Sequence, residues 1–265
     1  MQEFPRQVEK IANKVRVLDG SNNKIRQVPD YVQVMVHCNR IGLSKNRISS
    51  LPPGVSALVN LRVLLLDNNR FTEIPKCILN LPKLERLNLS NNLIAEIPCA
   101  IEGLNSLKSL DVSHNNLVKL PRSLGKLQRL EEFHASGNAV ERLPVELAKL
   151  EKLRLMVVEN NKIQSVPSEV LLQCISLQTL ALHDNPLTIE QLRETKGYAE
   201  FEARRKAKWD KSIAGGVLLG PSRFDEGADR KVQESESPRI ASHNATSKDK
   251  KKKKSIKSGS GGRLT

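Results

Sequence analysis

The chain has 265 residues, a hydrophobic content of 38% and an aromatic content of 3%, so it is long enough to bury a core of mainly aliphatic side chains. Its formal net charge is +14. Residues 204–265 hold 17 Lys and Arg against 7 Asp and Glu, a net of +10, which leaves +4 for the remainder. The basic character therefore belongs mainly to the C-terminal tail and does not by itself indicate nucleic-acid binding by the folded part.

Cysteine usage and hydropathy exclude several further classes of protein. Cys38, Cys77, Cys99 and Cys174 form no CxxC pair and stand at no metal-ligand spacing with histidine. We interpret them as reduced thiols, and we expect neither a metal nor a cofactor. The sequence has no run of 18 apolar residues and no signal-peptide pattern. These features favour the cytoplasm, with the nucleus or a membrane periphery as alternatives.

The first predicted element, residues 1–14, is a partial repeat at the N-terminal edge, because Phe4-Pro5 has the form of the closing half of a repeat. Residues 15–187 then contain eight copies of the frame apolar-x-x-apolar-x-apolar-x-x-Asn, each followed by an apolar segment, with a Pro that closes the copy in examples such as Leu84–Pro98. The frame asparagines are 23 residues apart, with a last step of 24, which indicates stacked repeats. This predicted structural ladder consists of Asn23, Asn46, Asn69, Asn92, Asn115, Asn138, Asn161 and Asn185.

Alternation within the frame predicts a short strand in each copy, with apolar side chains inward and the intervening ones outward. Parallel pairing of these strands would form a concave face, while the convex side is expected to be irregular, 3-10 or helical. Each frame asparagine is expected to satisfy backbone groups in the turn after its strand. The sequence thus predicts an α/β solenoid. Gly20 and Cys38 replace apolar residues in the first two copies, so we expect that edge to be the weakest.

Residues 188–213 are predicted to form a helical C-terminal cap. Thr188 and Gln191 have the spacing of a capping box, and Gly197 separates a short helix from a longer one. Tyr198, Phe201 and Trp209 follow at helical spacing. We interpret them as the aromatic face that covers the last repeat, with a partner-binding helix as the alternative.

Residues 214–265 are expected to be a disordered basic tail, because they are rich in Gly, Ser, Lys and Asp. Lys250–Lys254 is an unbroken run of five lysines. Its composition is compatible with a solvated tail, a nuclear-localisation signal, or weak contact with nucleic-acid phosphate or an anionic membrane. A nucleic-acid or membrane-associated protein that acts through this tail is therefore the alternative function.

The outward residues of the strands are the candidate binding surface, and they lie two, four and six positions before each frame asparagine. Among them, Val63–Leu65 and Leu155–Val157 are expected to be exposed apolar pairs. The competing interpretation is that several of these side chains only brace or solubilise the strands. The predicted protein-binding residues are Arg86, Asn88, Asp111, Glu132, His134, Leu155 and Val157.

Catalysis is the competing use of the same face. Asp111, Glu132 and His134 are residue types that serve in acid/base or metal chemistry. The predicted face is open and shallow, and no nucleophile or second histidine stands nearby in the frame. We therefore predict no catalytic site and no enzyme.

The repeat frame resembles the leucine-rich repeat, and the chain resembles the intracellular leucine-rich-repeat family that includes leucine-rich repeat-containing protein 57 and its plant relatives. The likeness is carried by Glu3–Pro5, Asn22–Ile25 and the segment from Leu192 to Arg204, and it covers residues 3–211. It implies a leucine-rich-repeat solenoid and a cytosolic interaction or signalling adaptor. By family analogy alone, the partner would be a Ras-like GTPase, a kinase or a phosphatase. Position 2 is Gln2 and not Gly, so we expect no N-myristoylation of the chain as written.

Overall fold

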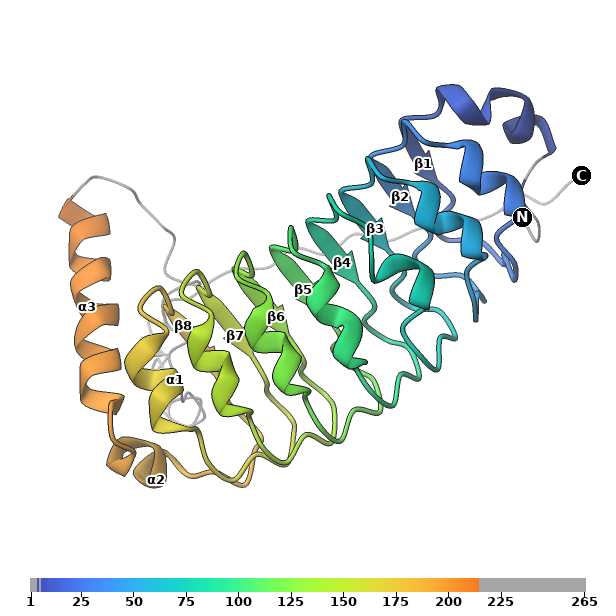
Figure 1. Cartoon of the computed structure of the whole chain (residues 1–265). Coiled ribbons are helices and arrows are strands. Elements are labelled where there is room, and N and C mark those ends of the chain that lie inside the picture. Colours follow the sequence, from blue (N-terminus) through green and yellow to red (C-terminus); the bar gives the residue numbers. More distant parts are fainter. Residues whose placement is uncertain (1–3, 5, 215–265) are drawn as a thin grey trace, which may run out of the picture. The chain divides into compact units, whose positions relative to one another are not determined.

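Eight short strands form one parallel sheet in the order in which they occur along the chain (Figure 1). The computed structural model describes residue 4 and residues 6–214, which all belong to the compact unit Met1–Val232. The strands are β1 (Val17–Asp19), β2 (Arg40–Gly42), β3 (Val63–Leu65), β4 (Arg86–Asn88), β5 (Ser109–Asp111), β6 (Glu132–His134), β7 (Leu155–Val157) and β8 (Thr179–Ala181).

Helical segments run along one side of the sheet in Figure 1, and nearly all of them are short 3-10 turns. The 3-10 elements are η1 (Arg6–Lys14), η2 (Asp30–Val34), η3 (Pro53–Ala57), η4 (Lys76–Ile78), η5 (Cys99–Gly103), η6 (Arg122–Lys126) and η7 (Val145–Lys149). From η2 onward each begins after a proline, whose fixed φ prepares the turn. The eighth repeat has one extra residue and forms the α-helix α1 (Ser168–Gln173) instead.

The core lies between the strands and these helical segments. The central residue of each strand from β2 onward is buried, as Leu87 and Phe133 illustrate. Gly20 fits the first copy because Leu43 occupies the space: a Cβ on Gly20 would lie 3.2 Å from Leu43 Cδ2. Cys38 is also buried, and burial raises the pKa of its thiol, so it acts as the small hydrophobe predicted for that position.

The frame asparagines connect neighbouring repeats. The Asn92 amide donates to the carbonyl oxygens of Leu89 and Ser90 in its own repeat and to that of Leu66 in the preceding one, at 3.0–3.2 Å. Its Oδ1 accepts the Phe71 N–H at 3.0 Å. One side chain therefore satisfies donors and acceptors of two repeats that would otherwise be buried without partners.

The turn before each frame asparagine contains one residue in the left-handed backbone conformation. The residue before every frame asparagine has a positive φ, and these residues are Asn22, Lys45, Asn68, Asn91, His114, Gly137, Asn160 and Asp184. Asn and Asp tolerate this conformation better than most residues, and Gly adopts it without a steric cost. Gly137 has a second constraint, because a Cβ there would lie 2.4 Å from Nδ1 of His114.

Two α-helices follow the last strand: α2 (Ile189–Glu194) and α3 (Tyr198–Ala214). The predicted capping box is present, since Thr188 Oγ1 accepts the Gln191 N–H and the Gln191 side chain accepts the Thr188 N–H. Gly197 has a φ of +93°, and a Cβ on it would lie 2.7 Å from Cγ of Leu172. Helix α3 packs against α1, with Phe201 only 1% exposed.

The predicted fold class is therefore confirmed: a parallel strand face is backed by mainly 3-10 segments and followed by two helices at the C-terminal end. The predicted tail, residues 214–265, lies outside the described residues except for Ala214, which is the last residue of α3. No helix in the described part is long and apolar enough to cross a membrane.

Candidate functional site

The strand face brings the seven predicted binding residues together on four adjacent strands. The register pairs Arg86, Ser109, Glu132 and Leu155 in one row across β4 to β7. Asn88, Asp111, His134 and Val157 form the neighbouring row. The predicted residues are therefore side-chain neighbours across adjacent strands.

Four of these residues have structural partners. The guanidinium of Arg86 lies 3.8 Å from the Glu132 carboxylate, across the strand between them. Asn88 and Asp111 each accept, with Oδ1, the N–H of the residue two positions later, at 2.9 Å. These two side chains thus close local turns at the strand ends. Asn88 and Asp111 therefore each make a contact of the kind that the bracing interpretation expects.

His134, Leu155 and Val157 are half-buried, as are Val63 and Leu65. The two apolar pairs were expected to be exposed, and this expectation is wrong, because all four side chains are half-buried. Side chains on flanking strands, about 4.8 Å away, cover part of each apolar surface. The apolar area available to a partner is correspondingly smaller, and it lies in shallow positions between polar neighbours.

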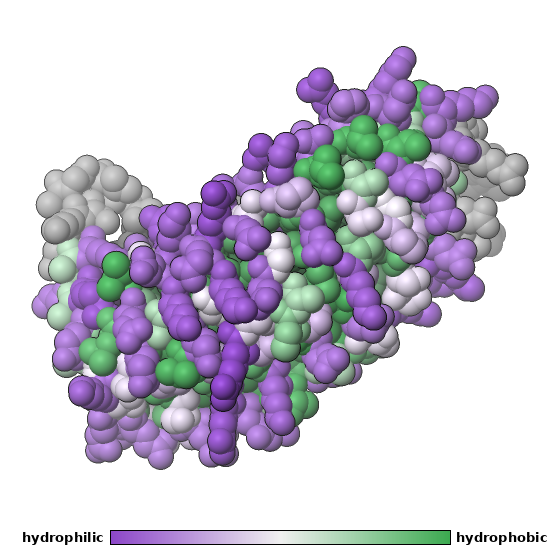
Figure 2. Space-filling model, in the orientation of Figure 1, coloured by the Kyte–Doolittle hydropathy of each residue, from purple (hydrophilic) through white to green (hydrophobic). Residues whose placement is uncertain are grey.

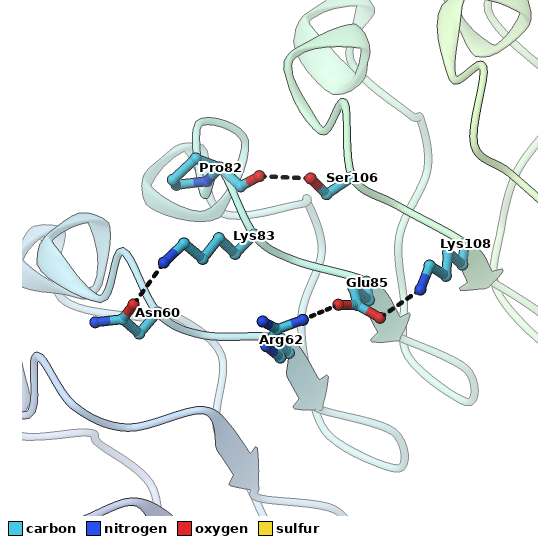
Figure 3. Close-up of polar contacts among 7 residues, drawn as sticks. All are labelled: Asn60, Arg62, Pro82, Lys83, Glu85, Ser106 and Lys108. Atoms are coloured by element: carbon cyan, nitrogen blue, oxygen red, sulfur yellow. Dashed lines mark hydrogen bonds and ion pairs between the residues drawn. The ribbon is translucent and has the colours of Figure 1, made fainter.

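The upstream edge, defined as the residue immediately before each strand, alternates in charge through the middle repeats (Figure 3). The Glu85 carboxylate bonds both Arg62 and Lys108, with 2.8 Å to the Lys108 ammonium. Arg154 lies 3.8 Å from Glu131 further along. The hydrogen bond from Lys108, and then that from Arg62, hold the pKa of Glu85 below its ordinary value. Unlike charges stacked one repeat apart thus link successive repeats.

The downstream edge, defined as the residue immediately after each frame asparagine, differs in the first three repeats. It carries Lys24, Arg47 and Arg70 in succession, and all three are exposed. Lys45 and Arg26 lie beside them on the same segments and are exposed too. None of the five forms an ion pair with a described residue. These positions follow the frame asparagine, so strand alternation, which predicts only the outward positions before it, does not indicate them.

The helical face is mostly hydrophilic in Figure 2, with hydrophobic residues gathered over the first repeats. Val34, Val36 and Val59 are exposed there. A groove of about 500 Å³ is lined by residues of η3, η4 and the segments before them, including Ser49 and Cys77. Burial raises the pKa of the Cys77 thiol, which disfavours a reactive thiolate. Within residues 4 and 6–214, no cluster of three or more His, Cys, Asp or Glu could hold a metal ion.

The remaining predicted residues belong to the C-terminal region. Phe201 is buried in the core, and Tyr198 is half-buried, with its ring centre 6.4 Å from that of Phe201. The side chain of Trp209 and the whole of Lys250–Lys254 lie outside the described residues. Arg204 donates to the Leu171 carbonyl oxygen, and Lys208 donates to that of Ile175 at 2.9 Å. These two cations bind the last carbonyls of the α1 segment.

Family models agree with the repeat geometry. A "Leucine rich repeat" model matches residues 36–94, and a "Leucine Rich repeats (2 copies)" model matches residues 82–128. The chain has the leucine-rich-repeat fold, and residues 36–128 match leucine-rich-repeat family models. Its similarity to plant intracellular Ras-group-related LRR protein 7 of Oryza sativa subsp. japonica is 43% identity over 60 residues, which are 23% of each chain. The match therefore spans about a quarter of that relative's length.

Solved leucine-rich-repeat structures share the fold. A leucine-rich-repeat protein of Leptospira interrogans superposes with a TM-score of 0.67 at 30% identity, covering 72% of this chain and 54% of that one. The ectodomain of the Arabidopsis thaliana receptor kinase GASSHO1/SCHENGEN3, solved in complex with CASPARIAN STRIP INTEGRITY FACTOR 2, gives a TM-score of 0.62 at 31% identity. That match covers 69% of this chain and 23% of the other. Leucine-rich repeats of this kind generally mediate protein–protein interaction.

Proposed function

We propose that this leucine-rich-repeat chain is a non-catalytic adaptor or scaffold of intracellular signalling in the cytoplasm, which binds a protein partner on its strand face. The observation that carries the proposal is the contiguous patch across β4 to β7. It combines a charged pair, Arg86 and Glu132, with a histidine and two half-buried aliphatic side chains. Apolar positions within a polar surround are the usual composition of a protein interface.

The dimensions of the strand face support this proposal. Eight strands spaced about 4.8 Å apart make a row about 34 Å long. A standard protein interface buries about 800 Å² on each partner, which a surface of this length accommodates. The Arg86–Glu132 pair is exposed enough to exchange its partner for a group on another protein without a large desolvation cost.

The contacts of the acidic residues support binding over catalysis. Asp111 Oδ1 already accepts the Ser113 N–H, and Glu132 faces the Arg86 guanidinium. Each carboxylate therefore has a contact within the strand face itself, which is the role expected of a residue that shapes an interaction surface. His134 is therefore better placed to contribute a ring surface and one hydrogen bond to a partner.

The class of partner is proposed from relatives. The GASSHO1/SCHENGEN3 ectodomain was solved with CASPARIAN STRIP INTEGRITY FACTOR 2, and the rice relative is named for a Ras-related group. A Ras-like GTPase is accordingly our first candidate for this chain, with a kinase or a phosphatase as the other two.

Affinity capture with paired variants tests the strand face. The test variant is Glu132→Ala/His134→Ala/Val157→Ser, which spares Asp111 because its carboxylate closes a turn. The control is Arg129→Ala/Lys149→Ala/Lys152→Ala, three exposed cations that form no ion pair with a described residue. We expect the wild type and the control to recover the same specific partners and the test variant to lose them. Recovery of those partners by the test variant, when its circular dichroism and unfolding midpoint match the control, would overturn the proposal.

A further inference from the structure

We propose that the downstream edge of the first three repeats is a second binding surface, separate from the strand face, which takes an acidic segment of a protein partner. Its central row is Lys24, Arg47 and Arg70, flanked by Arg26 and Lys45. All five side chains are exposed, and none forms an ion pair with a described residue. We call them the cationic edge.

Backbone hydrogen bonds hold the central row in register. Arg47 N–H donates to the Ile25 carbonyl oxygen at 2.8 Å, and Arg70 N–H donates to the Ile48 carbonyl oxygen at 2.9 Å. The three residues therefore follow one another at about the spacing of neighbouring strands, about 4.8 Å. Ile25 and Ile48 are buried, so the residues on either side of them point outward. The row is set by the stacking of the repeats and not by flexible loops.

Like charges at this spacing repel, and the upstream edge avoids them through the middle repeats. The upstream edge alternates sign from Arg62 through Glu85 to Lys108, with both contacts formed (Figure 3). Lys126 likewise lies 2.8 Å from Glu102 of the preceding repeat. The three successive cations of the downstream edge have no intervening carboxylate, in contrast to the upstream edge, and an acidic ligand would remove their repulsion.

Asp19 and Asp67, two of the three acidic residues in 16–70, have hydrogen-bond partners outside the cationic edge. The Asp67 carboxylate accepts hydrogen bonds from the Ser44 hydroxyl and the Asn68 amide. Asp19 accepts the Ser21 N–H, and this bond, with a smaller contribution from Arg40, holds the pKa of Asp19 below its ordinary value. The whole of residues 16–70 carries 8 Lys and Arg against 3 Asp and Glu, a net of +5.

The chemistry of the edge favours an acidic peptide over other anionic partners. The other exposed side chains on these segments are Gln27, Ser49, Ser50, Thr72 and Glu73. No aromatic residue stands among them to stack on a nucleic-acid base, and no large apolar residue stands among them to insert into a bilayer. An extended peptide presents side chains to one face about 7 Å apart, within reach of long Lys and Arg side chains, and its backbone can bond the hydroxyls.

The test uses the full chain and a fluorescein-labelled decapeptide of alternating Glu and Ser, with the Gln–Ser decapeptide as the uncharged probe. The test variant is Lys24→Gln/Arg47→Gln/Arg70→Gln. The control, Lys119→Gln/Arg142→Gln/Lys162→Gln, removes the same charge from exposed positions of later repeats and leaves the basic tail intact. Loss of three exposed charge contacts predicts binding of the Glu–Ser peptide about tenfold weaker in the test variant, against less than about twofold in the control. The affinity for the Gln–Ser peptide should be the same in the test variant and the control variant.

Carbodiimide coupling locates the bound peptide, because it joins a peptide carboxylate to a lysine amine in contact with it. We expect coupling to Lys24 and Lys45, mapped by mass spectrometry. Coupling confined to lysines after residue 204, or equal loss of affinity in both variants, would overturn the inference. It would also be overturned if the test variant lost more affinity for an oligothymidine or for phosphatidylserine vesicles than for the acidic peptide. The strand-face variant should bind this peptide normally, so the two proposals fail separately.

Discussion

The first three repeats and the later five have the same backbone frame but differ in the balance and pairing of their charged side chains. Residues 16–70 hold 8 Lys and Arg against 3 Asp and Glu, whereas residues 71–187 hold 13 of each. Every ion pair between described residues falls between residues 62 and 205. In a solenoid each repeat interacts mainly with its neighbours, so such a difference persists locally without altering the fold.

The two regions also end differently. Phe201 of α3 is buried over the last repeat, whereas Ile11 and Val17 beside the first repeat are 54% and 57% exposed. A cavity of about 10 Å³ lies among core residues of the first three repeats, including Leu18 and Leu43. We therefore expect the C-terminal region to be the more stable of the two, and the following experiments measure how far the two regions are independent.

Removal of the Phe201 ring should have the largest effect. Phe201→Ala is expected to lower the free energy of unfolding by about 3–5 kcal/mol, because it leaves a cavity in a closed part of the core.

Thiol labelling of the same variant then separates the two regions. Burial raises the pKa of Cys174 to about 12, and Cys38 is buried in the second repeat. In the variant, the rate of thiol labelling should rise at Cys174 and stay the same at Cys38. An equal rise at both cysteines would show that the solenoid opens as one cooperative unit.

The asparagine ladder gives the next largest effect. Asn115→Ala removes three donated bonds, to Leu89, Val112 and Ser113, and one accepted from Ile94, so we expect a loss of about 2–4 kcal/mol. Asn46→Ala removes the equivalent four bonds in the second repeat, to Gly20, Leu43 and Ser44 and from Ile25. We expect a smaller loss of about 1–2 kcal/mol, because the core of the first three repeats contains a cavity. Urea unfolding measures both. Equal losses would contradict the view that coupling between repeats weakens toward β1.

Charge reversal tests the electrostatic difference directly. Glu85→Lys would place three cations in succession on the upstream edge, and it should lower the free energy of unfolding by about 1–2 kcal/mol. Arg47→Glu would place a carboxylate between Lys24 and Arg70, and it should raise that free energy by about 0.5–1 kcal/mol. Lys162→Glu, flanked by Ala139 and Pro186 on the same downstream edge, is the control and should change little. Changes of the same sign in all three would remove the proposed contrast.

The smallest effect is a pH dependence of the balanced region. Hydrogen bonds from Lys108 and Arg62 lower the folded-state pKa of Glu85. Its stabilisation is therefore present above the ordinary carboxyl pKa and is lost as pH falls through the lowered folded value. Glu85→Gln should cost less than about 1 kcal/mol at pH 7, and nothing at a pH well below that folded value. Urea midpoints at the two pH values measure this; a constant difference would assign the effect to packing.

Much of the fold was predictable because one period determined it. The 23-residue step located every strand, the outward positions and the asparagines, since stacking requires equivalent residues to lie side by side. The extra residue before Asn185 marked the repeat that forms α1, but its effect on helix type was not foreseen. The half-burial of Val63 and Val157 was missed, because coverage by flanking strands depends on side-chain packing and not on alternation.

The candidate site was less predictable than the fold. Sequence alone placed Arg86 and Glu132 on the strand face, but their contact crosses β5 and depends on side-chain length and direction. The structural bonds of Asn88 and Asp111 needed backbone geometry. The cationic edge was visible as Lys24, Arg47 and Arg70 at the 23-residue spacing. Its lack of acidic partners could be established only from the positions of the carboxylates.

The asparagine ladder also bears on how such a chain changes in length. The Asn92 side chain bonds no group further away than the preceding repeat, and the next asparagine repeats that arrangement one step later. Excision of residues 93–115 would therefore join Asn92 directly to Asn116. Asn92 would then stand where Asn115 stood, with the same set of backbone partners available. Gene segments that encode one period can be duplicated or lost without redesign of the junction. The chain can thus gain or lose binding area in units of one strand.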